Sequence, residues 1–256
     1  MTDVVSVTKL AEILHTLLKT DRDVTIGVSG MTGEGKSTFI IKLVQAYCKI
    51  ADIQFTFDFL TWNRDELLTW IDGEGPEKKG RVPEYTPIVP DELFRMFYKR
   101  LWFEKKQIDA ISVLNMCRDR HLFIIGAIPN FWHLDKSFIT RVRFYCYVTV
   151  RGEVYVFQQE NNPFTVDVWN IKENEKSFRK NKIDKSPNFL FKVNYTDLNE
   201  KEKEQYLAIR NKKRIFNNDE PDIEMDERFE NLGKNLKPFV SEGDKLLQEF
   251  DRVFKK

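Results

Sequence analysis

The sequence is poor in the residues on which disulfide-rich and metal-binding proteins depend. It contains three cysteines, Cys48, Cys117 and Cys146, and three histidines among 256 residues. An odd number of widely spaced cysteines in apolar surroundings predicts buried thiols rather than disulfides. Neither the cysteines nor the histidines have the spacing of a metal site. These shortages exclude a disulfide scaffold and a zinc module.

Long apolar segments are also missing. No apolar run approaches the roughly 20 residues that cross a bilayer. The amino terminus, MTDVVSV, lacks the basic-then-apolar order of a signal peptide. The 41 basic and 40 acidic residues give a net charge of +1, which neither requires nor excludes nucleic acid. With 41% hydrophobic residues, we expect a globular cytoplasmic protein without membrane insertion, in the host cytoplasm if the source is viral.

The clearest motif lies in the stretch VTIGVSGMTGEGKSTF, residues 24–39. Its first half is an apolar, β-branched run that predicts a buried strand. Gly30-x-x-x-x-Gly35-Lys36-Ser37 follows, and then a predicted helix. Glycines let successive backbone N–H groups point at phosphate oxygens, and the helix N-terminus adds a positive dipole end. The stretch therefore predicts a phosphate-binding loop (P-loop) for a nucleoside triphosphate.

The spacing of this motif assigns roles to its side chains. Lys36 is expected to reach the β- and γ-phosphates, and the Ser37 hydroxyl to ligate the Mg²⁺ that bridges them. ATP and Mg²⁺ are therefore the expected cofactors. The residues predicted to surround the nucleotide are Gly30, Met31, Thr32, Gly33, Glu34, Gly35, Lys36, Ser37 and Thr38.

Hydrolysis requires a second acid for the metal and a group that orients the attacking water. The stretch YTPIVPDELF offers both, because Asp91 follows a short apolar run and Glu92 is the next residue. We expect Asp91 to face the metal and Glu92 to act as the catalytic base. Pro87 and Pro90 weaken the predicted strand, since each removes a backbone donor. The alternative interpretation is a helix N-terminus whose acids complement the dipole.

A polar residue at the end of another strand is a candidate γ-phosphate sensor. The apolar run HLFIIGAI, 121–128, predicts a strand in a parallel sheet, and Asn130 lies just beyond it, at the edge where such sheets bind ligands. Four arginines bracket Asn130, and an arginine from one subunit can complete the site of a neighbour. Arg118 and Arg141 are the catalytic candidates among Arg118, Arg120, Arg141 and Arg143.

Strands and helices alternate along the chain, which predicts an α/β fold with a parallel sheet between helical layers. We expect a RecA/ASCE-like αβα P-loop NTPase core and a charged, mainly helical C-terminal extension. The expected domains are an N-terminal helix in 1–21, the core in 22–170 and the extension in 171–256. Further predicted elements are a strand at 53–59, helices at 7–19, 64–72 and 92–118, and a hairpin of 144–150 with 153–159.

The C-terminal extension contains two basic runs and an acidic tail. Residues 172–185 and 200–214 each carry six basic and three acidic residues. A solvated helical surface accounts for such runs, and a track for nucleic acid is the functional alternative. The acidic piece after about residue 215 is open to disorder or to partner docking.

The order of these motifs resembles a known group of ATPases. Gly30 to Ser37, Asp91-Glu92 before a long helix, and the stretch CRDRHLFIIGAIPNFWHLDKSFITRVRFYCYVTVRGEVYVF are similar to zonula-occludens-toxin-like proteins and to FtsK-HerA-type DNA translocases of viruses, plasmids and archaea. The resemblance covers about residues 22–160. It implies ATP hydrolysis coupled to moving DNA or protein, usually by a ring-shaped homo-oligomer, and we expect a motor that moves or packages DNA for a virus or mobile element. It further implies partners among packaging or mobile-element proteins, reached through the extension.

Two other functions stay open at this stage. The stretch IGVSGMTGEGKST is also similar to uridine-kinase-like enzymes, and FTFDFLTWNRDELL resembles the strand-ending aspartate of such kinases. In that case Asp58 is the base, and the hydroxyl of a metabolite replaces water. The third possibility is a nucleotide-dependent switch with little turnover.

Overall fold

The computed structural model describes seven segments of the chain, namely residues 3–20, 22–73, 82–91, 93–99, 105–116, 120–162 and 164–216. The chain divides into a compact unit that ends at Asn211 and a second unit that begins at Lys212. All contacts and sites considered below lie in the first unit.

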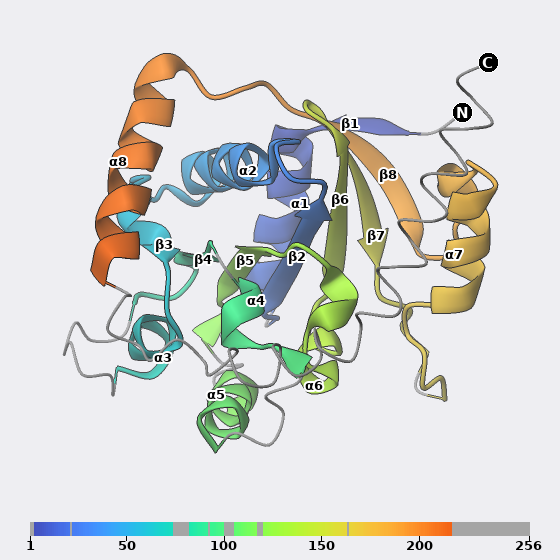
Figure 1. Cartoon of the computed structure of the whole chain (residues 1–256), viewed down its shortest axis with the longest axis horizontal. Coiled ribbons are helices and arrows are strands. Elements are labelled where there is room, and N and C mark those ends of the chain that lie inside the picture. Colours follow the sequence, from blue (N-terminus) through green and yellow to red (C-terminus); the bar gives the residue numbers. More distant parts are fainter. Residues whose placement is uncertain are drawn as a thin grey trace, which may run out of the picture. The chain divides into compact units, whose positions relative to one another are not determined.

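The centre of this unit is an eight-stranded sheet (Figure 1). Its strands, in sheet order, are β1 (Val4–Ser6), β8 (Phe189–Asn194), β7 (Glu153–Gln158), β6 (Phe144–Val150), β2 (Val24–Gly30), β5 (Phe123–Ala127), β4 (Pro87–Pro90) and β3 (Leu60–Thr61). Neighbouring strands are parallel except that β7 is antiparallel to both β6 and β8. The sheet is therefore a mainly parallel α/β sheet, as the sequence predicts.

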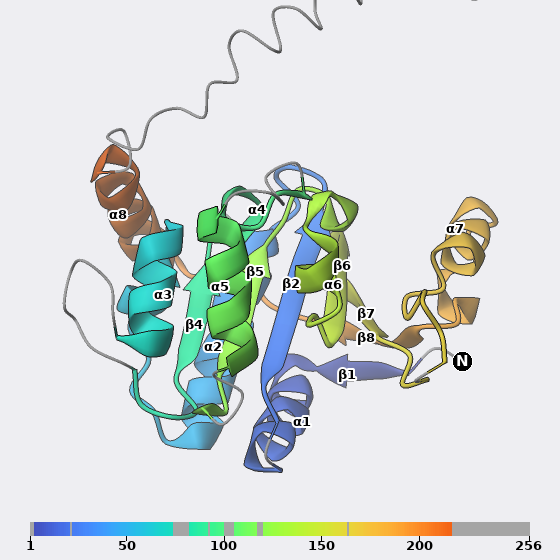
Figure 2. The same cartoon turned by 90° about the horizontal axis from the view of Figure 1, so that it is seen from below.

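Helices cover both faces of the sheet (Figure 2). Helices α1 (Val7–Lys19) and α2 (Lys36–Ala51) pack on one face, together with the buried Tyr206 and the partly buried Ile209 of α8 (Glu200–Phe216). The other face is covered by α3 (Arg64–Asp72), α4 (Leu93–Met96), α5 (Lys105–Met116), α6 (Lys136–Ile139) and α7 (Ile171–Arg179). The short 3₁₀ helices are η1 (Phe57–Phe59), η4 (Phe131–His133) and η5 (Ile183–Lys185).

The β2 strand is buried because it lies in the middle of the sheet, between β5 and β6. Its residues Val24, Ile26 and Val28 are fully buried and belong to the core under α1 and α2. Successive side chains of a strand point to opposite faces, so Gly27 faces the other layer. A side chain at Gly27 would lie 3.0 Å from Ile128 and 3.1 Å from Phe131, so glycine allows η4 to pack directly on β2.

The strand order separates the two strands on which the predicted chemistry depends. Strand β4, which leads to Asp91, is not adjacent to β2, since β5 lies between them. An additional strand between the P-loop strand and the acid-bearing strand fits the expected RecA/ASCE-like core. The prolines that weaken β4 in the sequence are its first and last residues, where lost N–H donors disturb the ladder least.

Three expectations from the sequence need correction. The strand expected at 53–59 is not formed: Thr56 instead caps the 3₁₀ turn η1 by accepting from the Asp58 N–H, and the strand is Leu60–Thr61. The helix expected at 92–118 is interrupted, because α4 ends at Met96 and Tyr98 forms a bridge with Leu134. The sheet also continues past residue 170, where the core was expected to end, since β8 pairs with β7 and β1.

Candidate nucleotide-binding site

The predicted P-loop joins the carboxyl end of β2 to the first turn of α2. Gly30 has φ +150°, and a side chain there would meet the Val148 carbonyl at 2.6 Å. Gly35 is the N-cap of α2 with φ +91°, and a side chain there would meet the Tyr195 hydroxyl at 2.8 Å. Both positions combine a positive φ with a close neighbour, so glycine is required at each. The loop therefore has the strand, turn and helix N-terminus that bind a phosphate chain.

Lys36 holds the loop together in this structure. Its ammonium group donates to the carbonyl oxygens of Gly30 and Met31, each at 2.9 Å. Burial lowers the pKa of Lys36, while nearby Glu34 opposes that shift. Met31, Thr32 and Gly33 are exposed at the tip of the loop. The lysine is thus positioned among the loop carbonyls, where it is available to a triphosphate that enters from solvent.

The predicted metal residues meet beside this loop. The Ser37 hydroxyl donates to Asp91 Oδ1 at 3.4 Å, a long hydrogen bond that joins the first turn of α2 to the end of β4. Asp91 is buried, and its backbone N–H donates to the Thr61 carbonyl of β3 at 3.0 Å. The sheet therefore brings together two residues that are 54 positions apart in the sequence.

The oxygen atoms at this point suit Mg²⁺. A hydroxyl and one carboxylate fit the habit of Mg²⁺, which binds to one or two carboxylates and completes its shell with phosphates and water. No cluster of three or more His, Cys, Asp or Glu residues that would hold a metal alone occurs in the part of the chain that the structure describes. Ser37 and Asp91 would hold the ion together with a nucleotide, and the ion would neutralise phosphate charge.

Helix α8 also reaches Asp91, which the sequence did not suggest. The Tyr206 hydroxyl donates to both carboxylate oxygens of Asp91, at 3.1 and 3.3 Å. Arg210 Nε lies 3.8 Å from Asp91 Oδ2, an ion pair longer than a hydrogen bond. Both residues lie within the basic run 200–214. The only signal in the sequence is a tyrosine inside a charged helical stretch, and a tyrosine is equally compatible with a solvated helix surface.

A second tyrosine contacts the P-loop from the end of β8. The Tyr195 hydroxyl lies 3.3 Å from the Glu34 carbonyl and 3.2 Å from the Gly35 carbonyl. Its ring packs on Phe39 of α2, with the ring centres 5.4 Å apart. Arg151, in the turn between β6 and β7, pairs with Asp197 at 3.4 Å. The residue that follows β8 thus contacts the P-loop and the helix after it.

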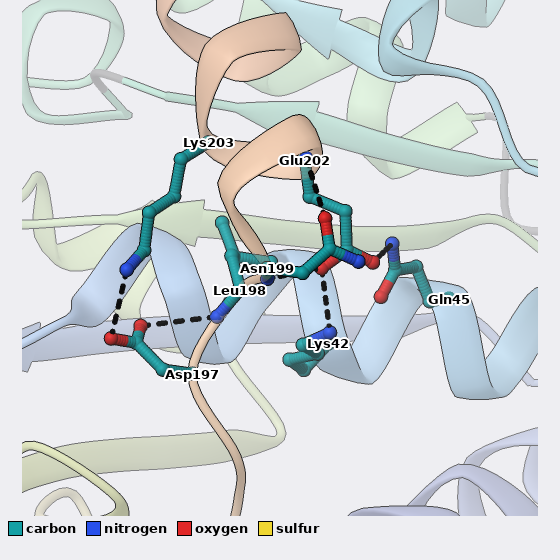
Figure 3. A network of polar contacts seen from close by, with 7 residues as sticks. All are labelled: Lys42, Gln45, Asp197, Leu198, Asn199, Glu202 and Lys203. Carbon is teal, nitrogen blue, oxygen red and sulfur yellow. Dashed lines mark hydrogen bonds and ion pairs between the residues drawn. The ribbon is translucent and has the colours of Figure 1, made fainter.

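The start of α8 is attached to α2 by a polar network (Figure 3). Glu202 accepts hydrogen bonds from Lys42 at 2.9 Å and from Gln45 at 2.8 Å. Asn199 and Glu202 also exchange hydrogen bonds between side chain and backbone N–H, each at 2.8 Å, which is a capping box. Because α2 also carries Lys36 and Ser37, α8 is anchored to the helix that forms the candidate site.

The remaining candidates are placed as follows. Asn130 lies at the carboxyl end of β5, where the Ile128 N–H donates to the Val28 carbonyl, so it is at the same edge of the sheet as the P-loop. It is exposed, and its Oδ1 caps η4 by accepting from the Trp132 N–H at 3.0 Å. Glu92 and Arg118, predicted as catalytic residues, lie outside the described residues.

Arg141 lies at the opposite end of β2. Its guanidinium donates to Asp23 at 3.0 Å and to Asn115 at 2.8 Å. Asp23 directly precedes β2, a strand of seven residues. Since a strand rises about 3.3 Å per residue, Arg141 is roughly 20 Å from the P-loop of its own chain. A catalytic role for Arg141 would therefore require the site of another copy.

Arg141 belongs to a basic depression at this opposite end. The depression has a volume of about 770 Å³ and is lined by Arg22, Asp23, Asn115, Lys136, Ser137, Thr140, Arg141 and Arg143. Among the described residues, no carboxylate lies at ion-pair distance from Arg22, Lys136 or Arg143. Burial and the neighbouring charge of Arg22 lower the pKa of Arg143. Among the described residues that line the depression, basic side chains therefore outnumber the acidic one, Asp23.

Comparisons with known proteins gave structural neighbours. No protein-family model matches the chain, and neither does any curated protein. The N-terminal domain of zonular occludens toxin from Neisseria meningitidis covers 70% of this chain and 96% of its own, at 14% identity and a TM-score of 0.40. The genome packaging NTPase B204 from Sulfolobus turreted icosahedral virus 2, in complex with ATP-gammaS, covers 62% of this chain and 86% of its own, at 12% identity and a TM-score of 0.35.

A chain of the E. coli MS115-1 HORMA:CdnC:Trip13 complex is another neighbour, at 12% identity and a TM-score of 0.38. That match covers 57% of this chain and 62% of the other, less than two thirds of its length. The neighbours include the toxin-like and packaging proteins that the sequence resembles. The chain has the fold of a P-loop NTPase, with the loop, the parallel sheet and the flanking helices described above. No helix within the described segments is both long and apolar enough to cross a membrane.

Proposed function

We propose that this protein binds and hydrolyses ATP with Mg²⁺, as a homo-oligomeric motor that moves or packages DNA. The observation that carries the ATPase part is the contact between Ser37 and Asp91 beside the P-loop. A phosphate loop alone binds a nucleotide, whereas a hydroxyl and a carboxylate together also hold the metal that hydrolysis requires. In this proposal Lys36 binds the β- and γ-phosphates and Glu92 orients the attacking water.

The kinase alternative loses support at its base residue. Asp58 lies in η1, before strand β3 rather than at its carboxyl end, and accepts from the Thr56 hydroxyl at 3.1 Å. A base for a metabolite hydroxyl would be expected at the carboxyl edge, where Asp91 is found. The nucleotide switch differs from the ATPase only in turnover, so hydrolysis measurements separate those two.

The nucleotide part is tested by Lys36→Ala, with Lys49→Ala as the control at an exposed position of the same helix. Loss of charged hydrogen bonds to phosphate is expected to weaken binding of a fluorescent ATP analogue about 100-fold. The control should bind like the wild type, and circular dichroism should show all three proteins folded. Undiminished binding by folded Lys36→Ala would contradict the P-loop assignment.

The DNA part rests on positive charge. The expected basic run 172–185 is partly neutralised within α7, where Lys176 pairs with Glu173 and Arg179 with Glu175. The basic depression has Arg22, Lys136 and Arg143 without such partners among the described residues. Phosphate contacts make affinity strongly dependent on salt and nearly independent of sequence. We therefore place the DNA backbone at the depression in this proposal.

Two double variants with the same change of charge test this placement. Arg22→Gln with Arg143→Gln should weaken DNA binding and reduce the salt slope by about 2, as expected for two lost phosphate contacts. Lys180→Gln with Lys182→Gln, in the run 172–185, should change both the DNA affinity and the salt slope less. Binding is measured at two salt concentrations with and without a non-hydrolysable ATP analogue, beside sedimentation. A protein that stays monomeric and binds no DNA under any of these conditions would contradict the proposed motor. The small-molecule kinase would then be the better account of the P-loop.

A further inference from the structure

Tyr206 forms hydrogen bonds with Asp91, the candidate metal carboxylate. It is buried, and its hydroxyl donates to both oxygens of Asp91 although the two residues are 115 positions apart. A tyrosine side chain is an uncharged phenol, so Tyr206 is a neutral donor to the carboxylate.

A neutral donor beside a metal-binding carboxylate has a known physical effect. Hydrogen bonds from outside the coordination shell fix the orientation of a ligand, and losing them commonly costs 10–100-fold in metal affinity or activity. Tyr206 does not add charge that would oppose a cation. Arg210, one helical turn further along α8, does add charge, at 3.8 Å from the same carboxylate. The two residues should therefore act on a metal at Asp91 with opposite signs.

Helix α8, which carries the Tyr206 phenol, is bound to α2, the helix that follows the P-loop. Lys42 and Gln45 of α2 bind Glu202 of α8, which is one helical turn before Tyr206 (Figure 3). Helix α2 also provides Ser37, the second oxygen ligand expected for the metal. One helix thus carries Ser37 directly and places Tyr206 against Asp91 through Glu202.

We propose that Tyr206 is a positioning residue that orients Asp91 for Mg²⁺, so that helix α8 completes the metal half of the nucleotide site. Arg210 has the opposite effect: it balances the charge of Asp91 while no metal is bound and disfavours metal entry. This inference rests on the proposed function, since it assumes that Asp91 serves a metal that arrives with a nucleotide.

The test is the ratio of nucleotide affinities measured with Mg²⁺ and with a chelator in its place. Tyr206→Phe should reduce this ratio about 10–100-fold and leave the metal-free affinity unchanged. Arg210→Gln should raise the ratio about three- to tenfold, because a positive charge near the metal is removed. Tyr155→Phe, which removes a hydroxyl on β7 away from the site, is the matched control and should leave the ratio unchanged.

Several results would overturn the inference. They are an unchanged ratio in Tyr206→Phe, a shift of both α8 variants in the same direction, and an equal loss with and without Mg²⁺, which would indicate a structural role only. If Tyr206→Phe does not fold, Glu202→Gln provides the test: it should lower the ratio several-fold, and an unchanged ratio would overturn the inference. A wild-type protein that binds no nucleotide would instead contradict the proposed function itself.

Discussion

The two halves of the candidate nucleotide site are built in different ways. The phosphate half is one contiguous stretch, Gly30 to Ser37, whose shape follows from its glycines and from the helix that it starts. The metal half is assembled from the ends of α2 and β4 and from the middle of α8, through contacts of Asp91 with Ser37, Tyr206 and Arg210. The contiguous half depends on local backbone geometry, and the assembled half depends on long-range packing.

Among variants that distinguish the two halves, we expect the largest effect from a substitution in the contiguous half, the P-loop. Gly35→Ala places a Cβ at φ +91° and 2.8 Å from the Tyr195 hydroxyl. Backbone strain of this kind costs about 1–3 kcal/mol, so the free energy of unfolding should fall by that amount. Nucleotide affinity should fall about tenfold. Urea unfolding and fluorescent-nucleotide titration measure the two effects.

Gly33→Ala is the matched control for that variant. Gly33 has nearly the same dihedral, φ +90°, but a Cβ there meets nothing within 4 Å. Its variant should show the backbone strain without the clash at Tyr195, and should therefore be less harmful than Gly35→Ala. Equal losses in the two variants would show that the Tyr195 contact does not shape the loop.

A smaller effect is expected from the anchor of the assembled half. Glu202→Gln weakens the charged hydrogen bonds to Lys42 and Gln45, and we expect a loss of about 1 kcal/mol in the free energy of unfolding. For a chain of this size the melting temperature should fall by about 2–4 °C. Glu204→Gln, at an exposed position of the same helix, should change it by less. A similar shift in both variants would mean that the network in Figure 3 does not hold α8.

The difference between a contiguous and an assembled half also explains which parts of the site could be predicted from the sequence. The P-loop could be identified because its chemistry and its geometry lie in consecutive residues. The position of Asp91 at the end of a strand could be predicted from the short apolar run before it, although Pro87 and Pro90 argued against a strand; its role in metal binding stays a prediction. The structure has those prolines at the two ends of a four-residue strand, where the ladder tolerates them.

The contacts of Tyr206 and Tyr195 could not be predicted, because nothing near either residue in the sequence refers to Asp91 or to the P-loop. Long-range packing alone brings them there. The strand expected at 53–59 was wrong for a related reason. Alternation of apolar residues suggested a strand, but the Thr56 side chain offered the backbone a competing hydrogen bond and stabilised a turn.

The most direct test of the central claim is release of phosphate from ATP, measured with and without Mg²⁺ for the wild type, Lys36→Ala and Asp91→Asn. The claim is that Ser37 and Asp91 beside the P-loop form one metal-dependent hydrolytic site. We predict Mg²⁺-dependent hydrolysis in the wild type, none above background in Lys36→Ala, and in Asp91→Asn a loss of about 100-fold with metal-free nucleotide binding intact. Hydrolysis that is absent from the wild type, or that persists unchanged in Asp91→Asn, would contradict the account.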